Sequence, residues 1–423
     1  MSTTNAGPVG ALWAGAIRER SLMLPLPVLL FLVAAVLRVL SFAIFYFGSV
    51  LAGQHGIVNV FDSVAIDKWA WYAAEHFRAG QWVDLRQNEL AGTWDIGFTY
   101  LVAFEYTVVG HHPEVARILD CLLASFQAPA AYLAARRTVL GPKVAARAGW
   151  LVACWPLSLY WSGFDLLKDP LVWFLLAIAL LALTESGWRR RPALGALAAG
   201  SVHVVRNYMG PGVAVALIIS SVLKKDWKAL IATIGALAAI EAVLLAAHFP
   251  PAWSPGPYLT NQELVTETQP ASLNNPGEQA STSEVFTPAG LATRFTIGTL
   301  TVTFGPGLRP LTDLAHPTLD WGMYPGLLVW IALLPFGILG LWRGFRLRDP
   351  ALWSVGLFAI GIWAGLALIY AGHALRQREM AFPATLIFVA SGLERPWPRR
   401  WWWFYGGYWV IVVAVLSVGA AIG

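Results

Sequence analysis

The sequence predicts an all-α protein that crosses a membrane about eleven times. Three observations support this fold class. The 423 residues are 57% hydrophobic and only 13% charged, with a mean hydropathy of +0.59, which is typical of a polytopic membrane protein. The apolar residues gather in long segments with few charges, and most Lys and Arg residues lie in alternate loops between them. Residues 1–423 are therefore expected to form a single transmembrane domain.

The first apolar segment, 26–48, is longer than the core of a signal peptide, so we expect an uncleaved membrane helix. Several of the later segments are shorter than the roughly 20 residues that a simple crossing needs. The later segments are 115–135, 144–162, 170–183, 194–205, 212–223, 229–247, 324–341, 352–370, 380–393 and 401–422.

Basic clusters mark the expected cytoplasmic side. Threading the segments alternately puts the loops around Arg136, Arg190, Lys224, Arg343 and Arg399 on one side, together with the N-terminus. Because cytoplasmic loops are enriched in Lys and Arg, this side is predicted to be the cytoplasmic face of a plasma (inner) membrane.

Two loops are then expected on the outer face, 50–113 and 250–321. The second is rich in Pro, Ser, Thr, Asn and Gln, so we expect it to be flexible, as a lid or acceptor-binding element or as a passive linker. In the first, the apolar run 94–110 contains Asp95 and Glu105. If it crossed the membrane, every later basic loop would lie outside, so we predict an interfacial helix.

The most charged stretch, 61–80, precedes that run. It lacks Pro and Gly between residues 63 and 79, which predicts a helix with Asp62 as its N-cap. Trp69, Ala73, His76 and Phe77 would share one face, as in a helix lying in the membrane interface. Asp67 would project from its first turns. A solvated amphipathic helix with ordinary surface charges is the alternative.

Cationic residues at the predicted outer ends of helices are candidates for phosphate binding, because guanidinium groups grip two oxygens at once. Arg206 follows the segment 194–205, and Arg376 and Arg378 open the segment 380–393. His203 and His373 lie beside them. The alternative is that these arginines meet lipid headgroups or pair with carboxylates of neighbouring helices.

Two further polar sites are predicted from position alone. Asp169 precedes Pro170 and is expected to cap the next helix, whereas Lys168 beside it has no such explanation. Arg38 falls inside the first membrane segment, where a carboxylate could satisfy it or its side chain could reach the interface. No Walker, GxGxxG or HExxH motif occurs, which disfavours a soluble nucleotide-binding enzyme.

These features resemble the GT-C class of integral-membrane glycosyltransferases, which includes protein O-mannosyltransferases and lipid A aminoarabinose transferases. The matching residues are Asp67, Trp71 or Tyr72, Ala74 and Gly80 in the first outer loop, then GFTYLVAFEYTVVG, ARRTVLG, WPLSLYWSGFDLLKDPLVWF with Asp169, HVVRNYMGP with Arg206, and Arg376, Arg378 and Pro383. The adjacent acidic pair of many members is replaced by Asp62 and Asp67, and the spacing to Gly80 favours Asp67 as the catalytic residue.

The resemblance implies a sugar donor on a polyprenyl phosphate at the outer leaflet and a hydroxyl acceptor on a glycan, lipid or protein, with inversion at the anomeric carbon. Asp67, or else Asp62, would deprotonate the hydroxyl, and Arg206, Arg376 and Arg378 would hold the donor phosphate. Lys168, His203, His373 and Tyr72 would contact substrate. In some relatives a divalent cation takes part, and here Asp67 and Asp169 would share Mg²⁺ or Mn²⁺.

Two other functions stay open at this point. A glycan polymerase or ligase with a polyprenyl-pyrophosphate donor would share the outer site. A lipid or solute transporter would instead line a route across the bilayer and typically show internal repeats, of which the sequence gives no convincing sign.

Overall fold

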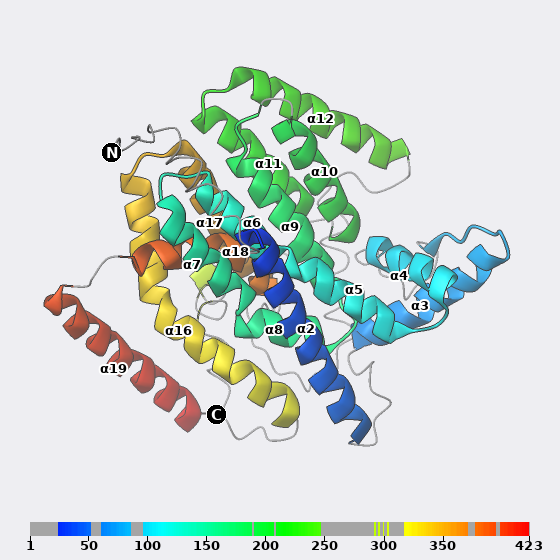
Figure 1. The fold of residues 1–423 in the computed structure, drawn as a ribbon, viewed down its shortest axis with the longest axis horizontal. Coiled ribbons are helices and arrows are strands. Elements are labelled where there is room, and N and C mark those ends of the chain that lie inside the picture. The colour runs from blue at the N-terminus through cyan, green and yellow to red at the C-terminus, as the bar shows by residue number, and fades with distance from the viewer. Residues whose placement is uncertain are drawn as a thin grey trace, which may run out of the picture.

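The computed structural model describes residues 24–51, 61–85, 96–187, 190–206, 209–246, 317–370, 377–394 and 398–422, together with 292, 295–296, 299 and 303. The regular structure in this part of the chain is helical (Figure 1). Its main elements are α2 (Leu26–Leu51), α3 (Phe61–Arg78), α4 (Ile96–Val109), α5 (Pro113–Ser125), α6 (Gln127–Arg136), α7 (Gly141–Ala153), α8 (Pro156–Phe164), α9 (Asp169–Thr184), α10 (Arg190–Val205), α11 (Met209–Leu223), α12 (Trp227–Ala246), α16 (Pro317–Arg346), α17 (Pro350–Tyr370), the 3-10 helix η2 (Gln377–Met380), α18 (Phe382–Gly392) and α19 (Arg399–Ile422).

Five helical stretches among the described residues are long and apolar enough to cross a membrane. They are Leu26–Leu51, Pro113–Arg136, Trp227–Ala246, Pro325–Arg346 and Pro350–Ala367. Shorter apolar helices accompany them. The prediction of a helical multi-pass membrane protein is therefore confirmed, whereas the number of crossings stays a prediction.

Two of the predicted segments are broken by proline. The segment 115–135 divides into α5 and α6 at Phe126, because the ring of Pro129 cannot donate to, and clashes with, the carbonyl of Ser125. The segment 144–162 divides into α7 and α8, and Trp155, just before Pro156, has an extended backbone with φ −68° and ψ 114°. Each of these two segments is thus a pair of short helices rather than one rod.

The basic loops lie together at one end of the bundle. Arg137 after α6 pairs with Glu185 after α9 at 3.0 Å, and Lys224 after α11 donates to the carbonyl of Glu185 at 3.1 Å. The backbone N–H of Val139 donates to Asp349, which follows α16, at 3.0 Å. This arrangement agrees with the alternate threading that the sequence predicts.

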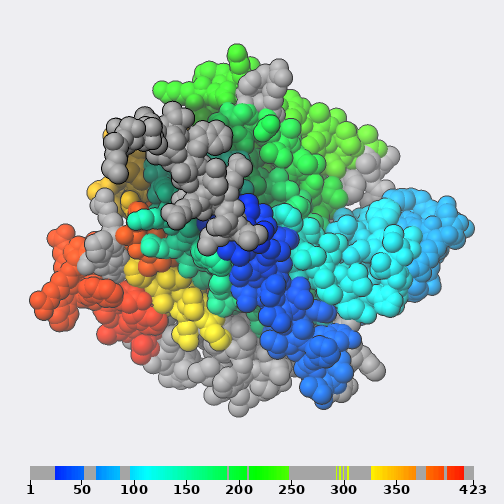
Figure 2. Space-filling view, viewed as in Figure 1, coloured from blue at the N-terminus to red at the C-terminus, as the bar shows by residue number. Residues whose placement is uncertain are grey.

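The paired helices α3 and α4 lie beside the bundle and project from it (Figures 1 and 2). Ile66, Ala70 and Ala74 form the buried face of α3, which packs with Val102 and Tyr106 of α4 in the common hydrophobic core. The helix already includes Phe61 and Asp62, so the prediction that Asp62 is the N-cap is wrong. Its position in the first turn still suits a carboxylate, since that end of a helix dipole is positive.

Two close approaches fasten this pair of helices to the bundle. A Cβ on Gly97, in the first turn of α4, would lie 2.6 Å from Cγ1 of Val204 on α10. Ser63, in the first turn of α3, donates to Asp165 between α8 and α9 at 2.7 Å. The interfacial position predicted for α3 and α4 stays a prediction, and most of the predicted flexible loop 250–321 lies outside the described residues.

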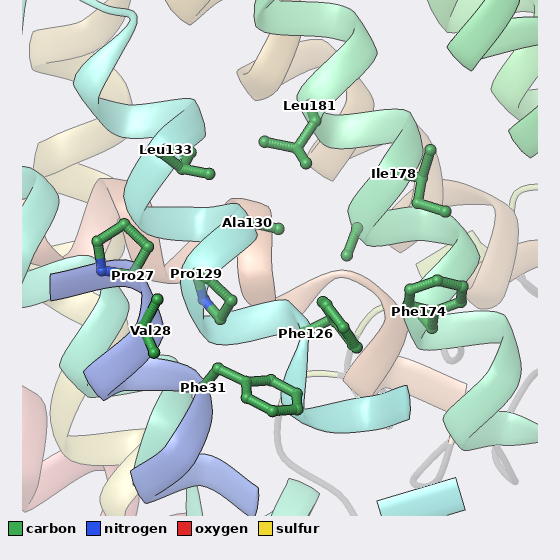
Figure 3. A pocket seen from close by; sticks show the side chains of 11 residues that line it. Pro27, Val28, Phe31, Phe126, Pro129, Ala130, Leu133, Phe174, Ile178 and Leu181 are labelled. Carbon is green, nitrogen blue, oxygen red and sulfur yellow. The ribbon is translucent and has the colours of Figure 1, made fainter. Parts of the chain in front are cut away.

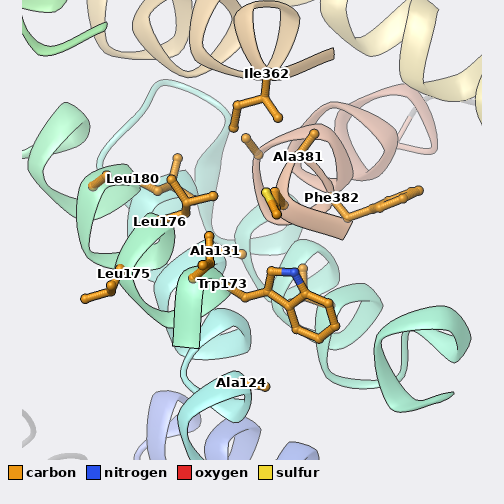
Figure 4. Packing of buried hydrophobic residues seen from close by; sticks show 14 of the residues in the cluster. Ala124, Ala131, Trp173, Leu175, Leu176, Leu180, Ile362, Ala381 and Phe382 are labelled. Carbon is orange, nitrogen blue, oxygen red and sulfur yellow. The ribbon is translucent and has the colours of Figure 1, made fainter. Parts of the chain in front are cut away.

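The core of the bundle depends on small residues that let helices approach closely. Trp173, Leu176 and Leu180 of α9 pack near Ala131 of α6, with Phe382 of α18 close by (Figure 4). The tightest approach joins α16 and α18, where a Cβ on Gly340 would collide with the carbonyl oxygen of Phe388.

We predict that Gly340→Ala lowers the thermal stability of the detergent-solubilised protein. The added methyl group has no room against a backbone carbonyl, so the helices must separate, at an overpacking cost of about 1–3 kcal/mol. Gly361→Ala in α17 is the control, because a Cβ there meets nothing within 4 Å. Equal unfolding temperatures for the two variants would show that the close packing of α16 and α18 is not needed.

Candidate functional site

Asp67 accepts hydrogen bonds from two side chains that the sequence analysis did not select. The hydroxyl of Tyr106 lies 2.6 Å from Oδ1, and Nε2 of His111 lies 3.0 Å from Oδ1 and 3.1 Å from Oδ2. The Asp67 side chain keeps 19% of its surface exposed and that of His111 keeps 41%. The predicted catalytic carboxylate therefore belongs to an accessible polar cluster of Asp67, Tyr106 and His111, which is called the Asp67 cluster below.

Aromatic stacking holds the Asp67 cluster in place. The ring of His111 stacks on Trp71 with a centroid distance of 4.8 Å, and the guanidinium of Arg78 lies 5.0 Å from the same indole ring. Arg78 also donates to the carbonyl oxygens of Tyr106 and Thr107 at the end of α4. Tyr72, the predicted substrate contact, lies next to Trp69 and His76 instead.

A second polar site is buried where α9 begins and α10 ends. Arg206 and Asp169 form an ion pair at 3.0 Å, with their side chains 3% and 0% exposed. The prediction that Asp169 caps α9 is wrong, because the N-cap position is Lys168 and no side chain caps this helix. Asp169 instead neutralises the arginine, and an unpaired charge at this depth would be costly.

A buried hydrogen bond links α3, which carries Asp67, to the segment that precedes α9. Ser63 lies one helical turn before Asp67 on α3 and donates to Asp165. Asp165 precedes Asp169 by four residues and is 1% exposed. On the neighbouring α5, the guanidinium of Arg117 donates to the carbonyl of Gly163. Asp165, which the sequence analysis did not select, thus ties α3 to the segment that leads into α9, the helix that begins with Asp169.

The remaining predicted residues divide into two groups. His203 is buried on α10 one turn before Arg206, and a Cβ on Gly210 of α11 would lie 2.6 Å from its Cβ. Lys168 is partly buried and adjoins Asp169. Arg376 and His373 lie outside the described residues, and so does the side chain of Asp62.

Arg378 is buried in η2, which packs against α9 and α17. Its Nε lies 3.9 Å from Oε1 of Glu379, and both side chains are 1% exposed. Burial raises the pKa of the Glu379 carboxyl to about 8, although the nearby charge of Arg378 opposes this shift. Burial also lowers the pKa of Arg378 to about 10.

Arg38 is fully buried in the middle of α2. Nη2 donates to the hydroxyl of Ser158 on α8 at 2.8 Å, and Nη1 donates to the carbonyl of Ala34 at 3.3 Å. Its hydrogen-bond partners are therefore a hydroxyl and a helix carbonyl rather than lipid headgroups, and Arg38 ties α2 to α8.

The donor set gives little support for a cation shared by Asp67 and Asp169. The oxygens of Asp67 face Tyr106 and His111, and Asp169 faces the guanidinium of Arg206. Among the described residues no group of three or more His, Cys, Asp and Glu side chains could hold a metal ion. The Mg²⁺ or Mn²⁺ site stays a prediction of the family resemblance, and no step below passes through it.

An apolar pocket of about 330 Å³ lies between α2, α6 and α9 (Figure 3). Phe31, Phe126 and Phe174 line it, with Leu133 and Leu181 towards the basic loops. All the residues that line this pocket are apolar, and none of them belongs to either polar site.

Comparison with known proteins shows a similarity of fold to two crystal structures. No protein-family model matches the sequence, and no curated protein matches it. The structure is similar to the crystal structure of ArnT from Cupriavidus metallidurans in the apo state, with a TM-score of 0.52 and 17% sequence identity over 88% of this chain. It is also similar to ArnT from the same organism bound to undecaprenyl phosphate, with a TM-score of 0.51 and 16% identity over 92% of this chain.

The chain spans about three-fifths of the length of these ArnT structures, 60% of one and 63% of the other. ArnT is an aminoarabinose transferase of the GT-C class. The predicted resemblance to this class is thus confirmed for the fold, which at this level of identity is what the comparison establishes.

The buried ion pair generates a prediction about stability. Arg206→Met leaves Asp169 buried without its counter-charge, which we expect to cost about 3–5 kcal/mol. Arg343→Met is the control, because Arg343 pairs with Glu394 at 2.6 Å with both side chains about one-third exposed, where a pair contributes roughly 0–1 kcal/mol. Thermal unfolding in detergent should separate the two variants clearly, and similar small losses would contradict a stabilising role of the buried pair.

Glu379 generates a prediction about pH. Its carboxyl keeps a proton in the folded protein between its ordinary pKa of 4.5 and its folded pKa of about 8, where the unfolded chain has lost that proton. Protonation of Glu379 therefore stabilises the fold fully below pH 4.5, and this contribution is lost as the pH rises towards 8. The unfolding temperature of Glu379→Gln relative to wild type should rise over this window, and a difference that is independent of pH would contradict the shift.

Proposed function

We propose that this protein is a membrane glycosyltransferase that moves a sugar from a polyprenyl-phosphate donor to a hydroxyl group of a glycan, lipid or protein. The observation that carries the proposal is the fold shared with ArnT, one structure of which holds undecaprenyl phosphate. The Asp67 cluster supports it, since a carboxylate held by hydrogen bonds at an accessible position is suited to activating a hydroxyl.

In the proposed reaction, the Asp67 carboxylate accepts the proton of the acceptor hydroxyl, and the hydroxyl oxygen attacks the anomeric carbon of the donor. The bond from this carbon to the phosphate oxygen breaks, its electron pair leaves with the polyprenyl phosphate, and the configuration inverts. Arginines stabilise the leaving phosphate. Arg206 and Arg378 are the described candidates, and for Arg206 the phosphate would share the guanidinium with Asp169.

The proposed orientation follows the charge distribution. The basic loops tied together through Glu185 and Asp349 would face the cytoplasm of the inner membrane, together with the N-terminus. Asp169 and Arg206 belong to the other ends of α9 and α10, and Asp67 lies on α3, which is tied to the segment before α9 through Ser63. This side would be the outer one, where a lipid-linked sugar donor would be presented.

We predict that Asp67→Asn abolishes transfer, with a loss of at least about 100-fold in turnover, because the neutral amide cannot activate the hydroxyl. The assay is release of polyprenyl phosphate from candidate polyprenyl-phosphate sugars, followed by mass spectrometry. Glu75→Gln is the matched control, since Glu75 is an exposed carboxylate on the same helix, α3. Both variants should unfold at the wild-type temperature.

Mass spectrometry of lipids that co-purify with the protein tests the donor class. Polyprenyl phosphate supports the proposal. Polyprenyl pyrophosphate would replace it with a glycan polymerase or ligase, and a preparation free of polyprenyl lipid that also lacks turnover would favour a transporter.

A further inference from the structure

His111 lies in the three-residue connection between α4 and α5. We propose that it is a positioning residue for Asp67, which orients the carboxylate so that Oδ2 meets the acceptor hydroxyl. The inference rests on the proposed function and adds to it the residue that sets the geometry of the activating group.

The two oxygens of the Asp67 carboxylate accept different numbers of hydrogen bonds. An ionised carboxylate can only accept, so the hydroxyl of Tyr106 and Nε2 of His111 are the donors. Among the described residues, Oδ1 accepts from Tyr106 at 2.6 Å and from His111 at 3.0 Å, whereas Oδ2 accepts only from His111, at 3.1 Å. Since each oxygen has two lone pairs, Oδ2 keeps the greater capacity for a substrate hydroxyl.

The imidazole is itself held by one stacked ring and one perpendicular ring. It stacks on Trp71 with an interplanar angle of 23° and meets Tyr106 edge to face at 5.1 Å. Trp71 is in turn covered by Arg78. The side chain of His111 is nevertheless 41% exposed, so filling the core does not explain its presence or its stacking.

The backbone around His111 links the Asp67 cluster to the bundle. Gly110 has φ +96°, a conformation that glycine adopts without strain, and the N–H of His112 donates back to its carbonyl at 2.9 Å. Pro113 then begins α5, which packs against α9, the helix that starts with Asp169. His111 therefore holds Asp67 at the junction between the α3–α4 pair and the membrane bundle.

Two variants of His111 distinguish the role of its N–H donor from that of its stacked ring. His111→Phe keeps an aromatic ring for Trp71 but removes the N–H donor, and we expect turnover to fall about 10- to 100-fold while the KM for the donor lipid changes by less than about two-fold. His111→Gln places an amide N–H near the position of Nε2 and should recover most of the turnover.

His112→Phe is the matched control, because this neighbouring, exposed histidine contacts Glu114 rather than Asp67. Its turnover and unfolding temperature should equal those of wild type. The unfolding temperatures of both His111 variants should also stay within about 2 °C of wild type, since their side chain is half exposed and its loss leaves no cavity.

The outcomes are distinct. Wild-type turnover in His111→Phe overturns the inference, and so does a loss of turnover in both His111 variants that is matched by a loss of thermal stability, which would make the residue structural. If the wild-type protein releases no polyprenyl phosphate from any candidate donor, the proposed function fails and takes the inference with it. If the wild-type protein releases polyprenyl phosphate and His111→Phe keeps wild-type turnover, the inference fails and the proposed function stands.

Discussion

The need to pair charges inside an apolar helix bundle determines how the polar elements of this protein fit together. Lipid offers no hydrogen-bond partner, so a buried guanidinium must find one in the protein. Arg206 forms an ion pair with Asp169, and Arg38 donates a hydrogen bond to the hydroxyl of Ser158. The first contact joins the start of α9 to the end of α10, the next helix along the chain, and the second joins α2 to α8, so both contacts hold helices of the bundle together.

The Asp67 cluster differs from these buried sites because the side chains of Asp67 and His111 are partly exposed. Its carboxylate is held by Tyr106 and His111 from outside the helix that carries it, and Ser63 on that helix reaches the turn before α9. An accessible carboxylate is thus carried by a helix that Ser63 ties to the segment leading into the buried ion pair.

Helices and their boundaries followed from hydropathy and proline, and each predicted apolar segment has a helical counterpart, although 115–135 and 144–162 are broken. The local predictions for Asp62 and Asp169 as helix caps were wrong: α3 already begins at Phe61, and Asp169 pairs with a distant arginine that its sequence position does not reveal. Arg206 lies 37 residues after Asp169, and His111 lies 44 residues after Asp67. A polar pair such as His111 and His112, directly after an apolar run and Gly110, was the available signal, but it carries no spacing that points to Asp67.

The unequal lengths of the helices have a consequence for the surrounding lipid. Helices α10 and α11 have 16 and 15 residues and expose Leu197 and Val215, whereas α12 has 20 residues. At 1.5 Å per residue these helices are about 24, 23 and 30 Å long. Helices α10 and α11 are therefore shorter than the roughly 30 Å hydrocarbon core of a typical bilayer. Where α10 and α11 meet lipid, hydrophobic mismatch would thin the adjacent bilayer.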